Sequence, residues 1–585
     1  MTPETRTCQN CKKDFLIEEV DFDFYEKIKV PPPTFCPECR MIRRLSFLNR
    51  SNLYHRKEAV GGKEILATYP AEADVVVYER DYWWSDAWDP MEYGRDVDFS
   101  RPFLEQVQEL NRIVPWPSRA VQRMVNSDYC NQATGDKNCY LCFDGNNSED
   151  CMYGVGFTKM KNCLDFYQSD NSQLSYELFW SASCYECFYV MNSYACRDVW
   201  FSRDCRNCQN CIGCVGLRNK QYYILNRPYS KEDYEKKVQE LNLGSYTAWR
   251  ALYEQFFELQ KRIPVKYMHG RKNITAFGDY IYGTKNVRRS FEVVDAENIA
   301  YSQTIAWNTK DSYDYTSWGL NSELIYESVS VGENCRNVKF SFDCWPACSD
   351  MEYCLNCHSS SNLFGCVGLK KKEYCILNKQ YSKEDYLELH TKIIEHMSAM
   401  PYRDRMGREY RYGEMFPSEF SPLAYTETAA HEDFPVSKEE ATRQGFLWRE
   451  PSPREFQITV SSDDLPDHIH DTSVAITREI IGCVQCHRAY RILPAEFAFY
   501  KKYEIPLPRF CFPCRHTKRL RLRNPFRLRH AQCQCAGKKS ENGIYQNQSP
   551  HFHGDSKCPN EFETSYAPDR PDIVYCEACY QAEVV

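Results

Sequence analysis

The sequence predicts a mainly β protein with helices, in which cysteine-rich zinc fingers at both ends flank a duplicated parallel β-solenoid. Three observations predict this architecture. Paired C-x2-C motifs recur near both ends, an internal duplication relates the two halves of the middle, and a twelve-residue period runs upstream of each copy. Paired C-x2-C motifs are typical of zinc sites, and a short period is typical of stacked coils.

The composition sets the class of protein. The chain has 585 residues, more than one ordinary domain, and 15% of them are aromatic, which is typical of folded chains. No apolar run reaches membrane-spanning length and the first residues are polar, so we expect a cytoplasmic protein with no membrane partner. In a reducing compartment, the 32 cysteines are expected to bind metal or to pack as small apolar groups.

The two ends of the chain repeat each other at an offset of 475 residues. In each copy, two C-x2-C pairs are separated by 24 residues, a spacing that suits a closed tetrahedral zinc site. A redox role for the C-x2-C pairs is the rival interpretation. The predicted ligands are Cys8, Cys11, Cys36 and Cys39 in the first site, and Cys483, Cys486, Cys511 and Cys514 in the second.

The residues around these cysteines resemble a known family. The motifs that carry the resemblance are Phe24-Tyr25, Pro33, Phe35 and Cys36-Pro37-x-Cys39-Arg40. They are similar to the family of probable zinc-binding treble-clef domains, and the segment from Cys483 to Arg515 resembles it equally, with Phe512 inside its second knuckle. The resemblance implies metal binding and a helix that begins at the second knuckle. The whole layout also resembles uncharacterised long zinc-ribbon proteins of uncultured bacteria, which implies no function.

A third cysteine group follows the C-terminal finger. Its predicted ligands are Cys535, Cys558, Cys576 and Cys579, with Cys533 as the alternative to Cys535. The insertion between the two knuckles contains His551 and His553. With the two fingers, this group predicts three zinc ions per chain.

The segment after the N-terminal finger is a counterpart of that third group at an offset of 497 residues. Its ligand positions are occupied by Gly61, Glu79 and Tyr82. Because these residues replace cysteines, we expect this copy to bind no metal and to keep its shape by packing. The candidates for that packing are Trp83, Trp84 and Trp88.

The middle of the chain contains a second duplication, at an offset of 152 residues. Between residues 213–234 and their copy, 16 of 22 positions are identical. Each copy leads into a predicted helix that begins after Ser230 or Ser382, where an acidic residue three positions later forms a capping-box-like pattern. We expect these helices at about 231–262 and 383–398.

A finer period precedes each copy. Cys139, Cys151 and Cys163 lie twelve residues apart, and Ser175 continues the step. Each unit has a polar corner residue that tolerates left-handed backbone, a small or branched apolar residue, and a short aromatic-rich strand. This pattern favours two stacks of a β-solenoid, whereas periodic loops on a helical protein are the alternative.

These features divide the chain. The predicted divisions are a treble-clef finger at 1–57, a metal-free zinc ribbon with a helix at 58–125, solenoid repeats with capping helices at 126–264 and 265–400, a connector at 401–480, a treble-clef finger at 481–530 and a zinc ribbon at 531–585. The connector is rich in proline and charge, and one short helix is expected from Ser437 to Gln444.

Two further patterns could indicate a cofactor site or an active site, but the sequence supports them less well. The cysteines Cys205, Cys208, Cys211 and Cys214 step by three, as in some iron–sulfur motifs, but the repeat already requires small apolar residues there. The central acids could line a glycosidase-like groove, which needs paired carboxylates. These acids include Asp165, Asp170, Asp295, Asp311 and Asp314. Nothing in the sequence pairs them, so we predict that the chain is not an enzyme, and no small-molecule substrate is identified.

The charge is unevenly distributed. The acid-free stretches Arg40–Lys57 and Arg509–His530 carry six and eight Lys or Arg, so a net charge of −8 leaves −8 − 14 = −22 on the rest. Basic residues that follow a zinc knuckle are a usual way to bind phosphates, so we expect a scaffold that binds the backbone of RNA or DNA. The predicted contacts are Arg40, Arg43, Arg44, Arg515, Lys518, Arg519, Arg521, Arg523 and Arg527. The alternative is a protein-interaction platform that uses the aromatic solenoid, with the arginines packed against its acids.

Overall fold

The computed structural model describes residues 2–450 and 456–584. The other positions, which belong to the predicted first finger, connector and last ribbon, lie outside the described residues. The chain divides into two units, Met1–Ala120 with Met268–Glu450, and Val121–Tyr267 with Pro451–Val585. The N-terminal finger therefore shares a unit with the second repeat, and the C-terminal finger with the first. The predicted connector is divided between the units.

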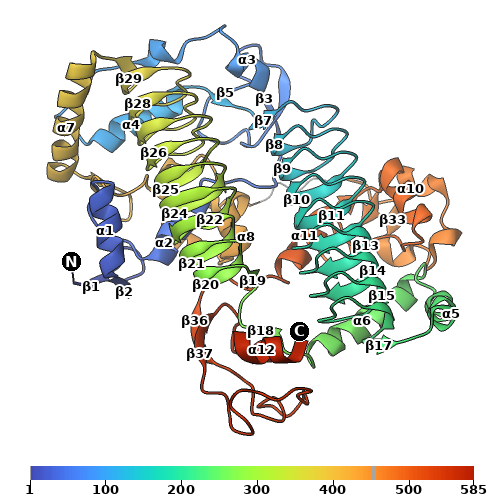
Figure 1. The fold of residues 1–585 in the computed structure, drawn as a ribbon. Coiled ribbons are helices and arrows are strands. Elements are labelled where there is room, and N and C mark those ends of the chain that lie inside the picture. The colour runs from blue at the N-terminus through green and yellow to red at the C-terminus, as the bar shows by residue number, and fades with distance from the viewer. Residues whose placement is uncertain (1, 451–455, 585) are drawn as a thin grey trace. The chain divides into compact units, whose positions relative to one another are not determined.

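The first repeat is a ladder of parallel strands. Along β10 (Met152–Thr158) and β11 (Leu164–Asp170), each residue lies opposite the one twelve positions later, as Met152 lies opposite Leu164. The predicted period is thus the register of the sheet. Figure 1 shows the strands of this repeat side by side. The other strands of this ladder are β7 (Val121–Gln122), β8 (Asn131–Thr134), β9 (Phe143–Asn146), β12 (Tyr176–Phe179), β13 (Tyr185–Met191), β14 (Arg197–Arg203), β15 (Gln209–Ile212), β16 (Gln221–Ile224) and the antiparallel β17 (Arg227–Pro228).

The second repeat is a similar ladder with some longer steps. β24 (Thr309–Gly319) pairs with β25 (Glu323–Gly332) at a step of thirteen, so that Lys310 lies opposite Glu323. One coil is divided into two strands that both pair with β24 and with the preceding β21. The other strands are β19 (Gly270–Arg271), β20 (Ile274–Tyr282), β21 (Lys285–Val294), β22 (Ala296–Ala300), β23 (Gln303–Ala306), β26 (Arg336–Lys339), β27 (Ser349–Glu352), β28 (Ser361–Phe364), β29 (Glu373–Ile376) and the antiparallel β30 (Lys379–Gln380).

Each coil of the first ladder turns four corners. Residues with positive φ recur at every third position, and those of one coil are Asn138, Leu141, Asp144 and Asn147. Asn and Asp adopt this conformation readily, whereas leucine does so at a cost. The sequence predicted one polar corner per repeat, and the structure has four because three-residue sides close the coil. On the exposed column, the Asn138 amide donates to Asp150 at 2.9 Å.

The residue after each corner fills the centre of the coil. In one coil these residues are Cys139, Cys142, Gly145 and Ser148, all of them buried. Glycine is required at position 145, because a Cβ there would lie 2.0 Å from the ring of Phe157. Most of the side chains in this narrow core are small, and the larger Phe157, Met160, Phe166 and Leu178 also enter it. Its buried members are Val121, Cys130, Ala133, Cys139, Cys142, Cys151, Phe157, Met160, Cys163, Phe166, Leu178, Cys184, Cys187, Val190, Cys196, Val199, Cys205, Cys208, Cys211 and Cys214.

Serine and cysteine in this core also bind the backbone. The Ser148 hydroxyl accepts a hydrogen bond from the Met160 amide, twelve residues later, at 2.9 Å. The Cys139 thiol donates to the carbonyl oxygen of Lys137 at 3.5 Å. Buried amide and carbonyl groups at the corners need such partners, because water cannot reach them. Serine and cysteine at these positions are thus both small and able to form one hydrogen bond.

The three-residue cysteine step follows from the same geometry. Cys205, Cys208, Cys211 and Cys214 occupy four successive inward positions and are at most 1% exposed. The Cys205 thiol donates to the carbonyl oxygens of Arg203 and Cys214, both at 3.7 Å. Within the described residues, none of the four belongs to a group that could hold a metal. Their environment is that of core residues.

A helix begins after each of the two ladders at the predicted position. The Ser230 hydroxyl accepts from the Asp233 amide, and Ser382 caps its helix in the same way. The single helix expected at 231–262 is wrong, because Asn242 adopts a left-handed conformation and ends the first helix, and Ser245 caps a second. The helices are α5 (Lys231–Leu241), α6 (Tyr246–Gln260) and α7 (Lys383–Ala399).

The two fingers have matching elements. Each has a short hairpin, one helix, and a second helix that begins at a cysteine. The N-terminal elements are β1 (Glu4–Thr7), β2 (Asp14–Ile17), α1 (Glu19–Lys27) and α2 (Pro37–Leu45). The C-terminal elements are β34 (Ile481–Gly482), β35 (Ala489–Tyr490), α10 (Pro494–Lys502) and α11 (Phe512–Leu520). In each unit the second helix contacts the ladder, α2 at β24 and α11 at β11 (Figure 1).

The segment whose expected ligand positions hold Gly61, Glu79 and Tyr82 has a hairpin like that of the third cysteine group. β3 (Tyr54–Lys57) pairs with β4 (Glu64–Ala67), as β36 (Arg529–Gln532) pairs with β37 (Glu561–Thr564). The side chain of Glu79 accepts two amide hydrogen bonds at the start of α3 (Arg80–Trp84). Trp83 is fully buried and donates to the Pro115 carbonyl oxygen at 2.7 Å, and its ring contacts those of Trp84 and Trp88. Packing holds this copy together.

The remaining elements are short. The helices are α4 (Phe103–Ile113), α8 (Ala429–Asp433), α9 (Lys438–Arg443) and α12 (Glu577–Val584), with 3₁₀ helices at Pro90–Tyr93, Ser418–Phe420, Tyr425–Glu427, Ser462–Asp464, Ile469–Asp471 and Val474–Arg478. The strands are β5 (Val77–Tyr78), β6 (Trp116–Pro117), β18 (Val265–Lys266), β31 (Tyr402–Arg403), β32 (Glu409–Tyr410), β33 (Val460–Ser461) and β38 (Val574–Tyr575). No helix in the described part of the chain is both long and apolar enough to cross a membrane.

The buried thiols predict a labelling pattern. Cys139, Cys151 and Cys163 should resist alkylation in the native protein and react after unfolding, because they are at most 3% exposed. Mass spectrometry of peptides from native and denatured samples measures this. As a control, the variant Lys137→Cys places a thiol on the exposed side of the same coil and should react at once. Rapid native labelling of all three core thiols would contradict the buried ladder.

A buried carboxyl group predicts a dependence of stability on pH. Burial raises the pKa of Asp136 from its ordinary value of 3.8 to about 7. The hydrogen bond from the Ser148 amide, at 2.9 Å, lowers this pKa but does not offset the effect of burial. The folded state then holds a proton that the unfolded state releases, so this contribution is complete below pH 3.8 and is lost as the pH rises through about 7.

The variant Asp136→Asn should therefore lose less stability than the parent between low and neutral pH. The difference in unfolding free energy should be on the order of 2–4 kcal/mol between about pH 4 and pH 8. Urea unfolding at a series of pH values measures it, with Asp150→Asn on the exposed column as the control. Parallel curves for the parent and Asp136→Asn would show that this carboxyl does not carry the effect.

Candidate metal centres and the arginine contacts of the fingers

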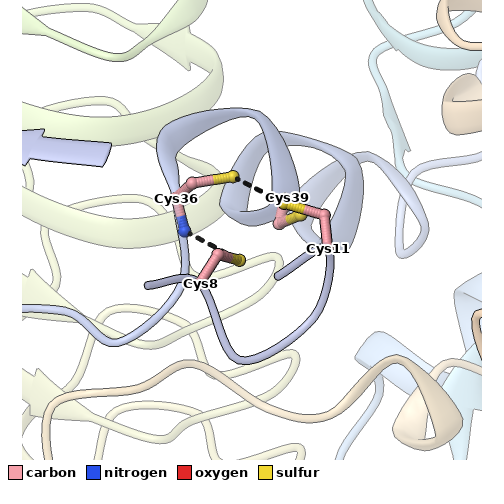
Figure 2. Close-up of side chains that lie close together, drawn as sticks. All are labelled: Cys8, Cys11, Cys36 and Cys39. Carbon is pink, nitrogen blue, oxygen red and sulfur yellow. Dashed lines mark hydrogen bonds between the residues drawn. The ribbon is translucent and has the colours of Figure 1, made fainter. Parts of the chain in front are cut away.

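The N-terminal finger brings its four cysteines together. Cys8 and Cys11 lie in the turn of the β1–β2 hairpin, Cys36 is the residue at which α2 begins, and Cys39 is in its first turn (Figure 2). The backbone amide of Cys36 donates to the Cys8 sulfur at 3.2 Å, and the side-chain amide of Asn10 donates to the Cys39 sulfur at 3.4 Å. Donors directed at sulfur and the positive end of a helix both stabilise thiolates.

The C-terminal finger has the same arrangement. Cys483 and Cys486 lie in the β34–β35 turn, and Cys511 and Cys514 lie at the start of α11. The Cys511 amide donates to the Cys483 sulfur at 3.4 Å. The equivalence of the two ends therefore extends from sequence to hydrogen bonding.

The sulfur separations fit a tetrahedral metal. Four sulfurs each about 2.3 Å from zinc are about 3.8 Å apart along every edge. The Cys11 and Cys36 sulfurs are 3.7 Å apart, and those of Cys486 and Cys511 are 3.6 Å apart. The four ligand atoms in each finger lie within 4.8 Å of one another. Both groups could hold a metal ion, and the donor set of four thiolates suits zinc.

The third group forms with one change in its membership. Cys533, Cys558, Cys576 and Cys579 gather, with the Cys558 sulfur 3.9 Å from that of Cys576 and 3.7 Å from that of Cys579. The Cys576 amide donates to the Cys533 sulfur at 3.2 Å, the same hydrogen bond as in the fingers. The alternative ligand Cys533 thus takes the place predicted for Cys535, which lies in a neighbouring group.

The arginines of the N-terminal finger face its ladder. Arg40 and Arg44 both contact Asp314, each at 2.8 Å, and Arg44 also contacts Glu327 at 3.0 Å. Arg43 pairs with Glu327 and with Glu414, the latter at 3.1 Å. All these side chains are at most 5% exposed. Burial alone lowers the pKa of Arg43, but the charges of its two carboxylate partners raise it more, so the guanidinium stays charged.

The C-terminal finger repeats this arrangement. Arg515 and Arg519 both contact Asp165, at 3.0 and 2.8 Å, and Arg519 also contacts Glu177 at 2.7 Å. Arg523 donates to the hydroxyl of Tyr167 at 2.8 Å. Burial raises the pKa of Glu177 to about 7, and the neighbouring Arg519 opposes that rise. In each unit, two arginines one helical turn apart therefore hold one aspartate of the ladder.

These contacts correct the predicted nucleic-acid surface. Six of the nine predicted residues have buried guanidinium groups that are bonded within the protein, because the finger helices face the ladders. They are Arg40, Arg43, Arg44, Arg515, Arg519 and Arg523. The other three, Lys518, Arg521 and Arg527, are exposed. The acids Asp314 and Asp165 are each the partner of two finger arginines.

Aromatic side chains complete the contact between finger and ladder. Phe24 of α1 stacks on Tyr313 with ring centroids 3.9 Å apart, and Tyr500 of α10 meets Tyr176 at 5.5 Å. The aromatic positions of the ladders that were expected to form a partner surface are thus partly covered by the fingers. No local pattern marks Glu327, Glu414 or Glu177, because their arginine partners are more than 280 positions away.

The comparisons with known proteins add little. The chain matches no protein-family profile and no curated protein sequence. One solved structure that it matches is that of a "putative acetyltransferase" from Desulfovibrio desulfuricans, at 9% identity, covering 49% of this chain and 85% of that one, with a TM-score of 0.10. A similarity of this size does not bear on the fold or the function.

Removal of one ligand predicts the loss of one ion. In Cys36→Ser or Cys511→Ser, one fewer zinc should copurify and that finger should unfold locally, because metal binding supplies much of a small finger's folding free energy. Elemental analysis and limited proteolysis measure the two effects. Protein purified without chelator that carries one zinc or none would contradict these assignments, and Cys142→Ser in the ladder should leave the metal content unchanged.

Proposed function

We propose that this protein is a zinc-dependent scaffold in which each metal-bound finger, a treble clef, fastens a stack of a duplicated β-solenoid. The observation that carries the proposal is the repeated contact of two finger arginines with one buried ladder aspartate, Asp314 in one unit and Asp165 in the other. The parallel register of both ladders supports the solenoid part of the proposal.

Zinc would act here by fixing the orientation of a helix. The second knuckle lies at the start of α2 or α11, and the arginines follow one and two turns later on the same helix. An ion bound at the knuckle would fix the helix in the orientation at which the arginines reach the ladder. Loss of metal should therefore weaken the ladder contact as well as the finger.

Binding of a polyanion is the second candidate function. Its support is the exposed Lys518 on α11 and the exposed Arg521 and Arg527 in the segment after it. Three cations make a smaller site than the nine expected, so affinity for RNA or DNA backbone should be modest and should depend steeply on salt. A protein partner would have to use surface that the fingers leave uncovered.

Two neighbouring arginines separate these functions. Arg519→Gln should lower the unfolding free energy by about 3–5 kcal/mol, because it removes the arginine partner of the buried Glu177 and one of the two arginine partners of Asp165. Arg521→Gln, two positions away and exposed, should change stability by less than about 0.5 kcal/mol. Thermal and urea unfolding of the two variants at equal zinc content measure this. Equal stability of both variants would contradict a structural role for the finger arginines.

The variant Arg521→Gln also tests polyanion binding. A labelled single-stranded RNA titrated at two salt concentrations should bind the parent protein more weakly at high salt, and Arg521→Gln should reduce the salt slope by about one unit. Absence of binding at low salt would exclude the second candidate and leave the scaffold proposal intact.

A further inference from the structure

A second group of ligand atoms adjoins the third cysteine site. Cys535, His551, His553 and Cys579 place one ligand atom each within 4.8 Å of the others. Cys579 belongs to this group and also to the four-cysteine group described above. The two groups thus share one sulfur.

The ring of His553 is oriented as a metal ligand. Its Nδ1 lies 2.7 Å from the carbonyl oxygen of Ser556, so this nitrogen carries the proton and donates it. The other nitrogen, Nε2, is then an acceptor, and it lies 3.3 Å from the Cys579 sulfur. Metal-binding histidines usually donate from one ring nitrogen to a carbonyl oxygen and bind the metal through the other nitrogen, and His553 has this arrangement.

His551 is held in the complementary way. Its side chain is 1% exposed, and its Nε2 lies 3.1 Å from a carboxylate oxygen of Glu583, which is itself fully buried. Its Nδ1 is buried and has no hydrogen-bond partner among the described residues. A buried nitrogen without a partner is costly unless something binds it, and Nδ1 is the nitrogen that the contact with Glu583 leaves available to a metal.

The carboxylate behind His551 is itself fixed. Glu583 accepts hydrogen bonds from the Tyr545 hydroxyl at 2.8 Å and from the Gln548 amide at 2.9 Å. It lies one turn after Cys579 on α12, so the ligand and the residue that orients the histidine are on the same helix face. A carboxylate, histidine and metal in a row are a common second layer of zinc sites.

The sulfur of the remaining ligand, Cys535, also accepts a hydrogen bond. The side-chain amide of Asn547 lies 3.2 Å from its sulfur and is positioned by the carbonyl oxygen of Gly537 at 2.6 Å. The same donation to sulfur occurs at Cys576, from Asn560 at 3.3 Å. These donors stabilise negative charge on sulfur, as expected for metal-bound thiolates.

We propose that the C-terminal ribbon binds two zinc ions, the first through Cys533, Cys558, Cys576 and Cys579, and the second through Cys535, His551, His553 and Cys579, with the Cys579 thiolate bridging them. This inference rests on the proposed zinc dependence and adds a fourth ion to the chain. Each cysteine gives up its proton on binding, and the histidines bind as neutral rings. Five thiolates and two Zn²⁺ then sum to −5 + 4 = −1, compared with −2 for one zinc on four thiolates.

The experiment measures zinc content and the coupling of two ions. Protein purified without chelator should carry about four zinc ions per chain, and the double variant His551→Ala with His553→Ala should carry about three. His530→Ala is the matched control, because His530 is exposed in the same ribbon and lies outside both groups, and it should retain about four.

Cobalt provides a readout that does not depend on stoichiometry alone. Two cobalt ions joined by one sulfur couple magnetically, so the fully loaded parent should show less EPR intensity per cobalt than the double histidine variant. About three zinc ions in both proteins, with equal EPR intensity per cobalt, would overturn the bridged site and leave the three-ion scaffold standing. One zinc or none in the parent would overturn the zinc dependence itself.

Discussion

Burial of the finger arginines is the constraint on which each unit depends. A guanidinium group removed from water must meet carboxylates with good geometry, or the cost of its desolvation is not repaid. Asp314 and Asp165 each receive two arginines from one helix, and this arrangement requires the helix to lie at one height and one angle on the ladder. The finger and the ladder therefore form one structural unit.

The metal groups and the arginine contacts cooperate through a single element. α2 carries the second knuckle at its first turn and the arginines along its length, and α11 does the same. Four sulfurs at tetrahedral separations limit how the helix start can move. The contacts with Asp314 or Asp165 limit the rotation of the rest of the helix. Neither constraint alone would define the position of the finger on its ladder.

The ladders supply a stiff partner because their coils are small. Four corners in twelve residues leave room for only one inward side chain per side. Serine and cysteine suit this space, since each fills it and binds a backbone group that would otherwise be unpaired, as Ser148 does for the Met160 amide. Phe157 and Phe166 lie in this core, whereas other aromatic residues, such as Tyr176 and Tyr313, contact the finger. The small coil thus explains the high cysteine content of this core.

Local patterns in the sequence determined the metal groups, the strand register and the starts of the helices. The spacing of Cys8 and Cys11 from Cys36 and Cys39 was sufficient to identify a metal group, because a knuckle is formed by neighbouring residues. The twelve-residue step of Cys139, Cys151 and Cys163 was sufficient to predict the parallel register, because each coil stacks on the one before it. Capping serines such as Ser230 likewise marked the helix starts.

Only the tertiary structure decided how the charges are used. From the sequence, Arg44 and Arg519 could face either phosphate or the acidic ladder, and their carboxylate partners lie more than 260 positions away. The same holds for the choice of Cys533 over Cys535, and for His551, whose partner Glu583 is on another element. Spacing along the chain determines which residues are neighbours in a turn or a coil. Burial, which decides whether a charge meets water or a carboxylate, exists only once distant segments have packed together.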